Sequence, residues 1–170
     1  MKLIILTDLW RIEKFDWFIN YKEQLKVEVV VYDSCELVNI DKKIYEETNL
    51  HQQFVNGGIE KAVEKLLAKE KNEVNVLAFS IGGTIAWKAI LKGLKVHTLF
   101  AVSATRLRYE TEKPNCNIQL FYGEKDEFKP NQNWFQQFEI EQKEINNKGH
   151  EVYKEKTFSN KIVSMINNRC

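Results

Sequence analysis

The sequence predicts an α/β fold, with a mostly parallel sheet of about six strands covered by helices on both faces. Short apolar runs alternate with longer amphipathic segments along the whole chain. A strand followed by a helix and a second strand forms a βαβ unit, in which the two strands are parallel. The 170 residues fit one domain, and no linker between domains, internal repeat or low-complexity tract interrupts residues 1–170.

In the first half of the chain, apolar and β-branched residues predict strands over residues 3–6 and 26–32. Residues 13–25 have helical spacing, with an apolar face formed by Phe15, Phe18, Ile19 and Leu25. A polar, acidic connection is expected over residues 35–49. The helix predicted next, over residues 51–72, is weakened near its start by Gly57-Gly58, and its inward face contains Ile59, Ala62, Val63, Leu66 and Leu67.

In the second half, strands are expected over residues 74–80, 95–103 and 117–123. Helices are expected over residues 81–94, 132–140 and 155–168. A last, weak strand falls within residues 138–145, where acidic and basic side chains fill alternate positions.

Composition excludes several classes of protein. The 25 Lys and Arg residues balance 24 Asp and Glu residues, so no polybasic surface for nucleic acid or membranes is expected. An aromatic content of 12%, with only 2 Pro and 7 Gly, argues against a disordered or collagen-like chain. The apolar run at the N-terminus meets Asp8 too early to form a signal peptide or a membrane span, so a cytoplasmic protein is expected.

The three cysteines are odd in number and widely spaced, which argues against a disulfide framework or a zinc cluster. We interpret Cys35, Cys116 and Cys170 as thiols in a reducing compartment rather than as nucleophiles. No metal and no cofactor are expected.

The most informative feature is Ser80, which lies where an apolar strand meets a helix, among the small residues Ala78, Gly82 and Gly83. A nucleophilic serine on a sharp turn needs small neighbours, because larger side chains two positions away would collide with nearby backbone. The helix after Ser80 presents unpaired N–H groups, so the Ile81 N–H can donate to an oxyanion. A phosphate-binding loop or a simple tight turn is the alternative for the same junction.

The pentapeptide AFSIG around Ser80 resembles the nucleophile elbow of the α/β-hydrolase superfamily, with alanine in place of the first glycine of Gly-x-Ser-x-Gly. LFYGEKDEF resembles the strand and turn that carry the acid of the catalytic triad, which indicates Asp126. NNKGHEVY resembles the loop that carries the histidine, which indicates His150. The resemblance implies a Ser80, Asp126, His150 triad in the chain order of that fold.

Each of these residues also has an ordinary alternative. Asp126 could be a turn residue, with Glu124 and Glu127 as its nearest substitutes, and His150 could be a solvated loop residue. The other two histidines are poorer candidates for the base. His51 opens a predicted helix far before the elbow, and His97 sits within a predicted strand.

The resemblance implies a minimal core that lacks the two N-terminal strands and the helical cap of larger relatives. Residues 103–116 are too few for a cap, so an open site that accepts bulky or carrier-bound acyl groups is expected. The same segment contains Arg106 and Arg108, which could guide a carboxylate, a phosphate or an acidic carrier protein. In a solvated loop, Glu110 and Glu112 would offset that charge.

In this superfamily the second oxyanion donor follows the first strand, just after a His-Gly pair. Thr7-Asp8 occupies that place here, so Leu9 is the expected donor. Asp8 departs from the family pattern, because a carboxylate facing the site would oppose the developing negative charge unless it points away or is paired. Its alternative role is that of a turn residue. Trp10 is expected either in the wall of the acyl pocket or in ordinary packing.

The leading hypothesis is a serine hydrolase that cleaves a carboxylic ester or thioester through an acyl-enzyme. Small hydrolases that demethylate pimeloyl-carrier-protein esters are similar in size. The alternative is a weak or inactive hydrolase fold that acts as a binding module. A nucleotide-binding domain is less favoured, because the glycines fit neither G-x-G-x-x-G nor G-x-x-x-x-G-K-[ST]. The expected partner is a small or carrier-bound acyl ester, and the oligomeric state stays open.

Overall fold

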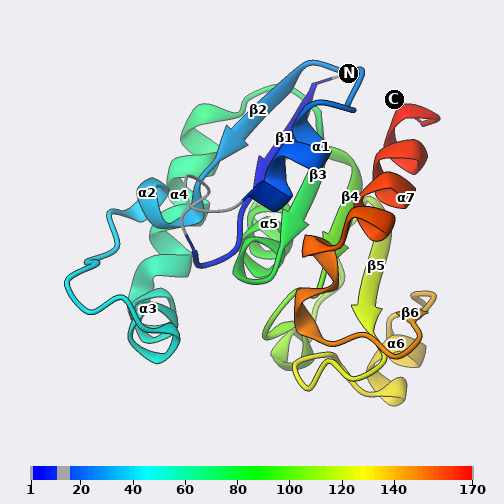
Figure 1. The fold of residues 1–170 in the computed structure, drawn as a ribbon. Coiled ribbons are helices and arrows are strands. Elements are labelled where there is room, and N and C mark those ends of the chain that lie inside the picture. The colour runs from blue at the N-terminus through cyan, green and yellow to red at the C-terminus, as the bar shows by residue number, and fades with distance from the viewer. Residues whose placement is uncertain (1, 11–15, 170) are drawn as a thin grey trace.

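The computed structural model describes residues 2–10 and 16–169. Six strands form one sheet in the order β2-β1-β3-β4-β5-β6 (Figure 1). Every neighbouring pair of strands is parallel, which confirms the predicted fold class. The strands are β1 (Leu3–Leu6), β2 (Val29–Tyr32), β3 (Val74–Phe79), β4 (Val96–Val102), β5 (Asn117–Gly123) and β6 (Lys143–Ile145).

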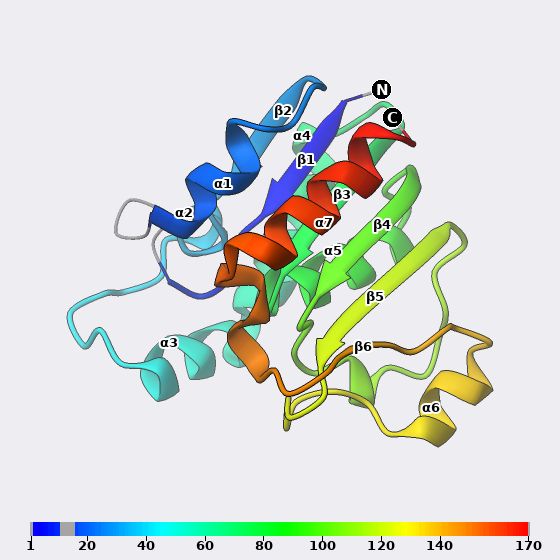
Figure 2. The same ribbon diagram turned by 45° about the vertical axis from the view of Figure 1, so that its right-hand side comes forward.

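Helices cover both faces of this sheet. α1 and α7 lie together over one face, and α4 and α5 lie over the other (Figure 2). The helices are α1 (Ile19–Lys22), α2 (Ser34–Val38), α3 (Glu47–Gln53), α4 (Ile59–Lys69), α5 (Ile81–Leu91), α6 (Gln132–Gln137) and α7 (Lys156–Asn167). Short 3-10 turns span Asp16–Phe18, Leu107–Tyr109 and His150–Lys154, and a π-helical turn spans Phe54–Gly58.

The apolar runs of the strands are continuous because both faces of the central strands are buried. Side chains of a strand alternate between faces. In β1, Leu3 and Ile5 join the core beneath α1 and α7, while Ile4 and Leu6 join the core beneath α4 and α5. All four side chains are fully buried. The strand that leads to Asp8 is therefore held between two cores.

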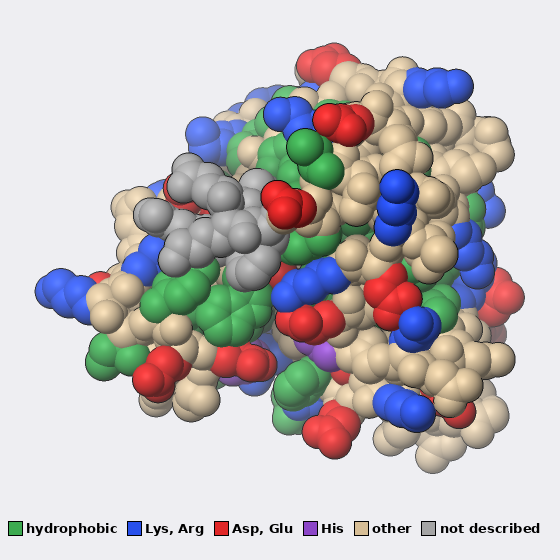
Figure 3. Space-filling model, in the orientation of Figure 1, with side chains coloured by type: hydrophobic (Ala, Val, Ile, Leu, Met, Phe, Trp, Pro, Cys, Tyr) green, Lys and Arg blue, Asp and Glu red, His purple; other side chains and the backbone are tan. Residues whose placement is uncertain are grey.

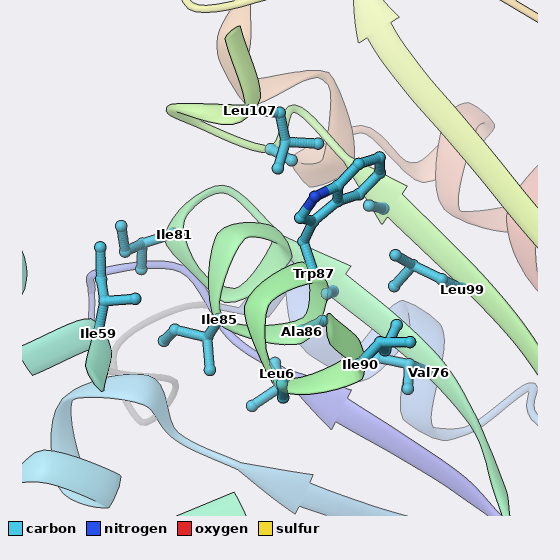
Figure 4. Close-up of a cluster of buried hydrophobic side chains, with 14 of the residues drawn as sticks. Leu6, Ile59, Val76, Ile81, Ile85, Ala86, Trp87, Ile90, Leu99 and Leu107 are labelled. Carbon is cyan, nitrogen blue, oxygen red and sulfur yellow. The ribbon is translucent and has the colours of Figure 1, made fainter. Parts of the chain in front are cut away.

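α5 is buried on almost every side, so its sequence is apolar rather than amphipathic. Its side chains pack against β1, β3, β4 and the start of α4 (Figure 4). Trp87 has the largest fully buried side chain of this cluster. Its ring lies 5.6 Å from the ring of Trp134, and its indole N–H donates to the Glu112 carbonyl at 3.1 Å. This packing fixes the helix that begins immediately after Ser80.

The predicted polar connection over residues 35–49 is wrong in part, because it contains most of α2 and the start of α3. The sequence signal for α2 is Asp33, a residue type favoured at the N-cap. Its side chain accepts hydrogen bonds from the Cys35 and Glu36 N–H groups. α3 has no side-chain cap. The predicted helix over 51–72 is interrupted at Gly57, where φ is +108°, and α4 begins at Ile59.

Other boundaries differ by shorter lengths. The helix predicted over 13–25 is a 3-10 turn followed by one α-helical turn, and its residues 13–15, including Phe15, lie outside the described residues. The last strand has three residues because it lies at the sheet edge and carries alternating charges. Between β4 and β5 the structure has one 3-10 turn and no cap domain, as expected.

Two of the three cysteines can be described. The buried Cys35 thiol donates to the Leu9 carbonyl, with Sγ 3.0 Å from the oxygen. Burial raises the pKa of Cys116 to about 11, so its thiol is protonated at neutral pH. Cys170 lies outside the described residues. In the described part of the chain, none of the helices combines the length and the apolar character that crossing a membrane requires.

Trp87→Ala is expected to lower the free energy of unfolding by about 3–5 kcal/mol, because it removes a large, fully buried side chain. Denaturant unfolding followed by circular dichroism would measure the change. Ile44→Ala is the matched control, because the Ile44 side chain is 55% exposed, and a change within about 0.5 kcal/mol is expected. A loss below about 1 kcal/mol for Trp87→Ala would contradict this account of the core.

Candidate active site

Ser80 lies in the turn between β3 and α5, with φ of 50° and ψ of −117°. A non-glycine residue with positive φ is strained, and such strain persists only where the surrounding structure fixes it. Three backbone hydrogen bonds do so here. The Ser80 N–H donates to Val102, and the Ser80 carbonyl accepts from Gly83 and Thr105. The turn holds Ser80 at the carboxyl end of the parallel sheet.

The small residues after Ser80 are required by close backbone contacts. A Cβ atom added to Gly82 would lie 2.6 Å from the Thr7 carbonyl oxygen, and one added to Gly83 would lie 2.5 Å from the Ala104 Cβ. Both distances are shorter than real Cβ contacts. The steric reason given for the sequence motif is therefore visible in the structure, and Gly82 lets the start of α5 reach the end of β1.

The structure brings Ser80, His150 and Asp126 together although they are far apart in the sequence. Ser80 Oγ lies 3.0 Å from His150 Nε2. His150 Nδ1 lies 3.1 Å and 3.0 Å from the two carboxylate oxygens of Asp126. Because the carboxylate accepts from Nδ1–H, the neutral imidazole has its lone pair on Nε2, where it can accept the serine proton.

Asp126 and His150 are held by contacts between their own loops. Asp126 is 3% exposed, and its Oδ1 also accepts from the Phe128 N–H at 2.9 Å. Gly123 at the end of β5 lies so close to the histidine loop that an added Cβ would be 2.4 Å from the Gly149 carbonyl oxygen. The absence of a side chain at Gly123 therefore sets the distance between the acid and the histidine.

A cleft of about 570 Å3 opens over Ser80 and His150. A smaller recess of about 200 Å3 adjoins it and shares Ser80 and His150 in its lining. In Figure 3, histidine side chains are visible among charged and apolar side chains. The other residues that line the cleft are Leu9, Glu47, Thr48, His51, Gln52, Val55, Thr105, Arg106 and Phe128.

The predicted pocket residues have different positions. Leu9 lines both hollows, and Trp10 lines the smaller one, where its ring lies 5.4 Å from that of Tyr45. Arg106 lines the cleft, whereas Arg108 does not. The Arg108 guanidinium donates to the Phe128 carbonyl at 2.9 Å and so supports a residue of the cleft wall.

Sequence reasoning missed the wall that α3 and the following turn provide. His51, which the sequence placed far from the elbow, lines the same cleft as Ser80. Burial, with Arg106 nearby, lowers the pKa of His51. The available signal was the spacing of Leu50 and Phe54, which are four residues apart and both fully buried. The predicted open site therefore has a wall from this segment in place of a cap.

Asp8 does not line the cleft, although it directly precedes Leu9. Its carboxyl is 1% exposed and accepts from the Trp10 N–H at 3.0 Å and from the Tyr153 hydroxyl at 3.1 Å. Burial raises the pKa of Asp8 to about 6, while these two hydrogen bonds act in the opposite direction. Asp8 is thus buried and paired. From the sequence, a carboxylate here is expected to be compatible with an oxyanion site only if it points away or is paired.

Two further expectations from the sequence concern metal binding and the oxyanion donor at Ile81. Among residues 2–10 and 16–169, no group of three His, Cys, Asp or Glu side chains could hold a metal ion. Ile81 is the first residue of α5, so its N–H belongs to the turn that lacks partners within a helix. Ile81 directly follows Ser80, which lines the cleft, although Ile81 itself is not among the lining residues.

Solved structures resemble this chain over nearly its whole length. A protein assigned to the alpha/beta superfamily of hydrolases from Xanthomonas campestris pv. campestris has a TM-score of 0.69 at 14% identity, with 99% of each chain covered. Mouse alpha/beta hydrolase domain-containing protein 10 has a TM-score of 0.68 at 14% identity, covering 98% of this chain and 88% of its own.

Est1E from Butyrivibrio proteoclasticus, solved with ferulic acid bound, has a TM-score of 0.66 at 10% identity. That match covers 98% of this chain and 86% of Est1E. No protein-family model and no curated protein matches the sequence.

Gly123→Ala is expected to push the histidine loop away from β5, because the new methyl group would overlap two carbonyl oxygens. The expected cost is about 1–3 kcal/mol in unfolding free energy, together with slower reaction of Ser80 with a fluorophosphonate. Gly149→Ala is a control for the glycine-to-alanine change itself, since nothing lies within 4 Å of its Cβ position and its φ of −98° suits alanine. If Gly123→Ala reacted with the fluorophosphonate as fast as the wild type, this role of Gly123 would be contradicted.

Asp8→Asn is expected to change how stability depends on pH. The folded state holds the Asp8 proton more tightly than the unfolded chain does, so the wild type loses stability as pH rises from about 4 to about 6. The corresponding free energy is about 3 kcal/mol, and the asparagine variant lacks this contribution. Urea unfolding of both proteins across that pH range would measure it. If the free energy of unfolding of both proteins changed with pH in the same way, the raised pKa of Asp8 would be contradicted.

Proposed function

The chain has the α/β-hydrolase fold, and on that premise we propose that it is a serine hydrolase that cleaves a carboxylic ester or thioester. The observation that carries the proposal is the chain of contacts from Ser80 Oγ through His150 to the buried Asp126 carboxylate. A hydroxyl, an imidazole and a carboxylate in this order are the groups that activate a serine for acyl transfer.

In the proposed reaction, Ser80 Oγ attacks the acyl carbonyl carbon while His150 Nε2 takes the hydroxyl proton. The tetrahedral intermediate collapses when His150 gives that proton to the leaving alcohol or thiol, which leaves an ester on Ser80. Water then attacks this acyl-enzyme, with His150 first accepting its proton and then returning it to Ser80. The products are a carboxylic acid and an alcohol or thiol, and Asp126 stabilises the transient imidazolium.

Backbone N–H groups are proposed to bind the oxyanion. Ile81 supplies one from the first turn of α5, where the helix dipole also favours negative charge. Leu9 supplies the second from the segment after β1, beside Ser80 in the cleft. Removing one such donor typically lowers the rate by about 100- to 1000-fold in serine hydrolases.

The cleft supports a small or carrier-bound acyl ester as the substrate. Leu9, Val55 and Phe128 offer apolar surface for an acyl chain, and Arg106 brings a positive charge to the same cleft. The Arg106 guanidinium lies 5.0 Å from the Tyr109 ring, whose side chain is 59% exposed. We propose Arg106 as a contact for an anionic part of the substrate or of its carrier, and Trp10 as a wall of the smaller recess.

Ser80→Ala is expected to abolish covalent labelling by a fluorophosphonate probe at neutral pH, and His150→Ala is expected to slow it by orders of magnitude. Intact-protein mass spectrometry would count the adducts. A panel of p-nitrophenyl esters of increasing chain length would then test turnover.

The structure offers matched controls for both variants. Ser103 directly follows β4, has the same φ of 50° and is fully buried, so Ser103→Ala should keep the adduct. His51 lines the same cleft, but the imidazole bonded to Ser80 Oγ is that of His150, so His51→Ala should also keep the adduct. No adduct on the wild-type protein, under conditions that label a known serine hydrolase, would refute the enzyme and favour a binding module with a hydrolase fold.

A further inference from the structure

Asp8 is a buried acidic residue that the proposed reaction does not use. Its two carboxylate oxygens accept hydrogen bonds from two separate segments. Oδ1 accepts from the Trp10 N–H at 3.0 Å, and Oδ2 accepts from the Tyr153 hydroxyl at 3.1 Å. Trp10 and Tyr153 are 143 positions apart in the sequence, so the carboxylate closes a long-range contact.

The two segments carry different parts of the site. The first contains Leu9, the proposed oxyanion donor. The second is the 3-10 turn that begins with His150, in which the Tyr153 ring lies 6.1 Å from the His150 ring at 88°. Asp8 therefore links the segment that would bind the oxyanion to the turn that carries the base.

The other contacts of the first segment lead away from the histidine. The Ser34 hydroxyl donates to the Thr7 carbonyl at 2.6 Å, the Thr7 hydroxyl accepts from the Ser34 N–H at 3.0 Å, and the Cys35 thiol donates to Leu9. These bonds fasten the segment to α2. Without the Asp8 carboxylate the segment would stay attached to α2 but lose this link to the histidine turn.

We infer that Asp8 is a positioning residue, whose carboxylate fixes the distance between the oxyanion donor at Leu9 and the imidazole of His150. This inference rests on the proposed hydrolase function. A displacement of about 1 Å within such a site can lower the rate about 100-fold. Substrate binding also uses Val55, Phe128 and Arg106, which Asp8 does not touch, so loss of the link is expected to lower kcat and to leave KM nearly unchanged.

The test compares Asp8→Ala, Asp8→Asn and Tyr153→Phe in the full chain, with p-nitrophenyl acetate as the probe ester. Asp8→Ala removes both hydrogen bonds and is expected to lower kcat by about 10- to 100-fold. Asp8→Asn keeps an acceptor for the Trp10 N–H and a donor that can reach the Tyr153 oxygen, so it should restore most of kcat. Tyr153→Phe removes one bond only and should fall between them.

Tyr21→Phe is the matched control. The Tyr21 hydroxyl donates to the Tyr153 carbonyl at 2.7 Å, so this variant removes a buried hydroxyl bond to the same turn without touching Asp8. It should lower stability as Tyr153→Phe does, yet keep kcat. Should Asp8→Ala fail to fold, Tyr153→Phe tests the link by removing a single hydroxyl group.

The outcomes separate this inference from the proposed function. A wild-type protein that neither cleaves the ester nor reacts with a fluorophosphonate overturns the proposed function and the inference with it. An active wild type with wild-type kcat in Tyr153→Phe and in folded Asp8→Ala overturns the inference alone. If Asp8→Asn loses as much as Asp8→Ala, the carboxylate charge matters rather than the link, and the positioning role is refuted.

Discussion

The close approach of α5 to the end of β1 is the constraint on which the site depends. Gly82 stands where any side chain would overlap the carbonyl oxygens of Leu6 and Thr7. This contact places the first turn of α5 beside the segment that contains Leu9. The buried packing of α5, with Trp87 at its centre, then keeps Ser80 in a strained turn that would otherwise relax.

Two buried carboxylates serve this arrangement in different ways. Asp126 accepts from His150 and from the Phe128 N–H, so it faces the reacting groups. Asp8 is as deeply buried, but its partners are Trp10 and Tyr153, and it does not line the cleft. A carboxylate next to the proposed oxyanion site is tolerated because its oxygens are directed to the Trp10 N–H and the Tyr153 hydroxyl.

α3 gives the cleft a wall, although residues 2–10 and 16–169 form no separate cap domain. It belongs to the connection between β2 and β3, and it ends at a π-helical turn that Gly57 closes with a positive φ. Leu50 and Phe54 hold it on the core, while His51 and Glu47 line the cleft. The substrate would therefore meet a mixed surface with an imidazole, a carboxylate and the Arg106 guanidinium, rather than an open sheet edge.

The sequence by itself determined the order of the six strands and the turn at Ser80, though not α2 or the start of α3, because buried strands need apolar runs and a sharp turn needs small neighbours. The resemblance in three short segments also indicated Asp126 and His150, which the structure brings together with Ser80. Only the tertiary structure decided that α3 walls the cleft and that Asp8 pairs with Tyr153. The spacing of Leu50 and Phe54 indicates a buried helix face but not where that helix lies. The Asp8 contact spans 145 positions, and a side chain's partners at that separation depend on how the whole sheet is assembled.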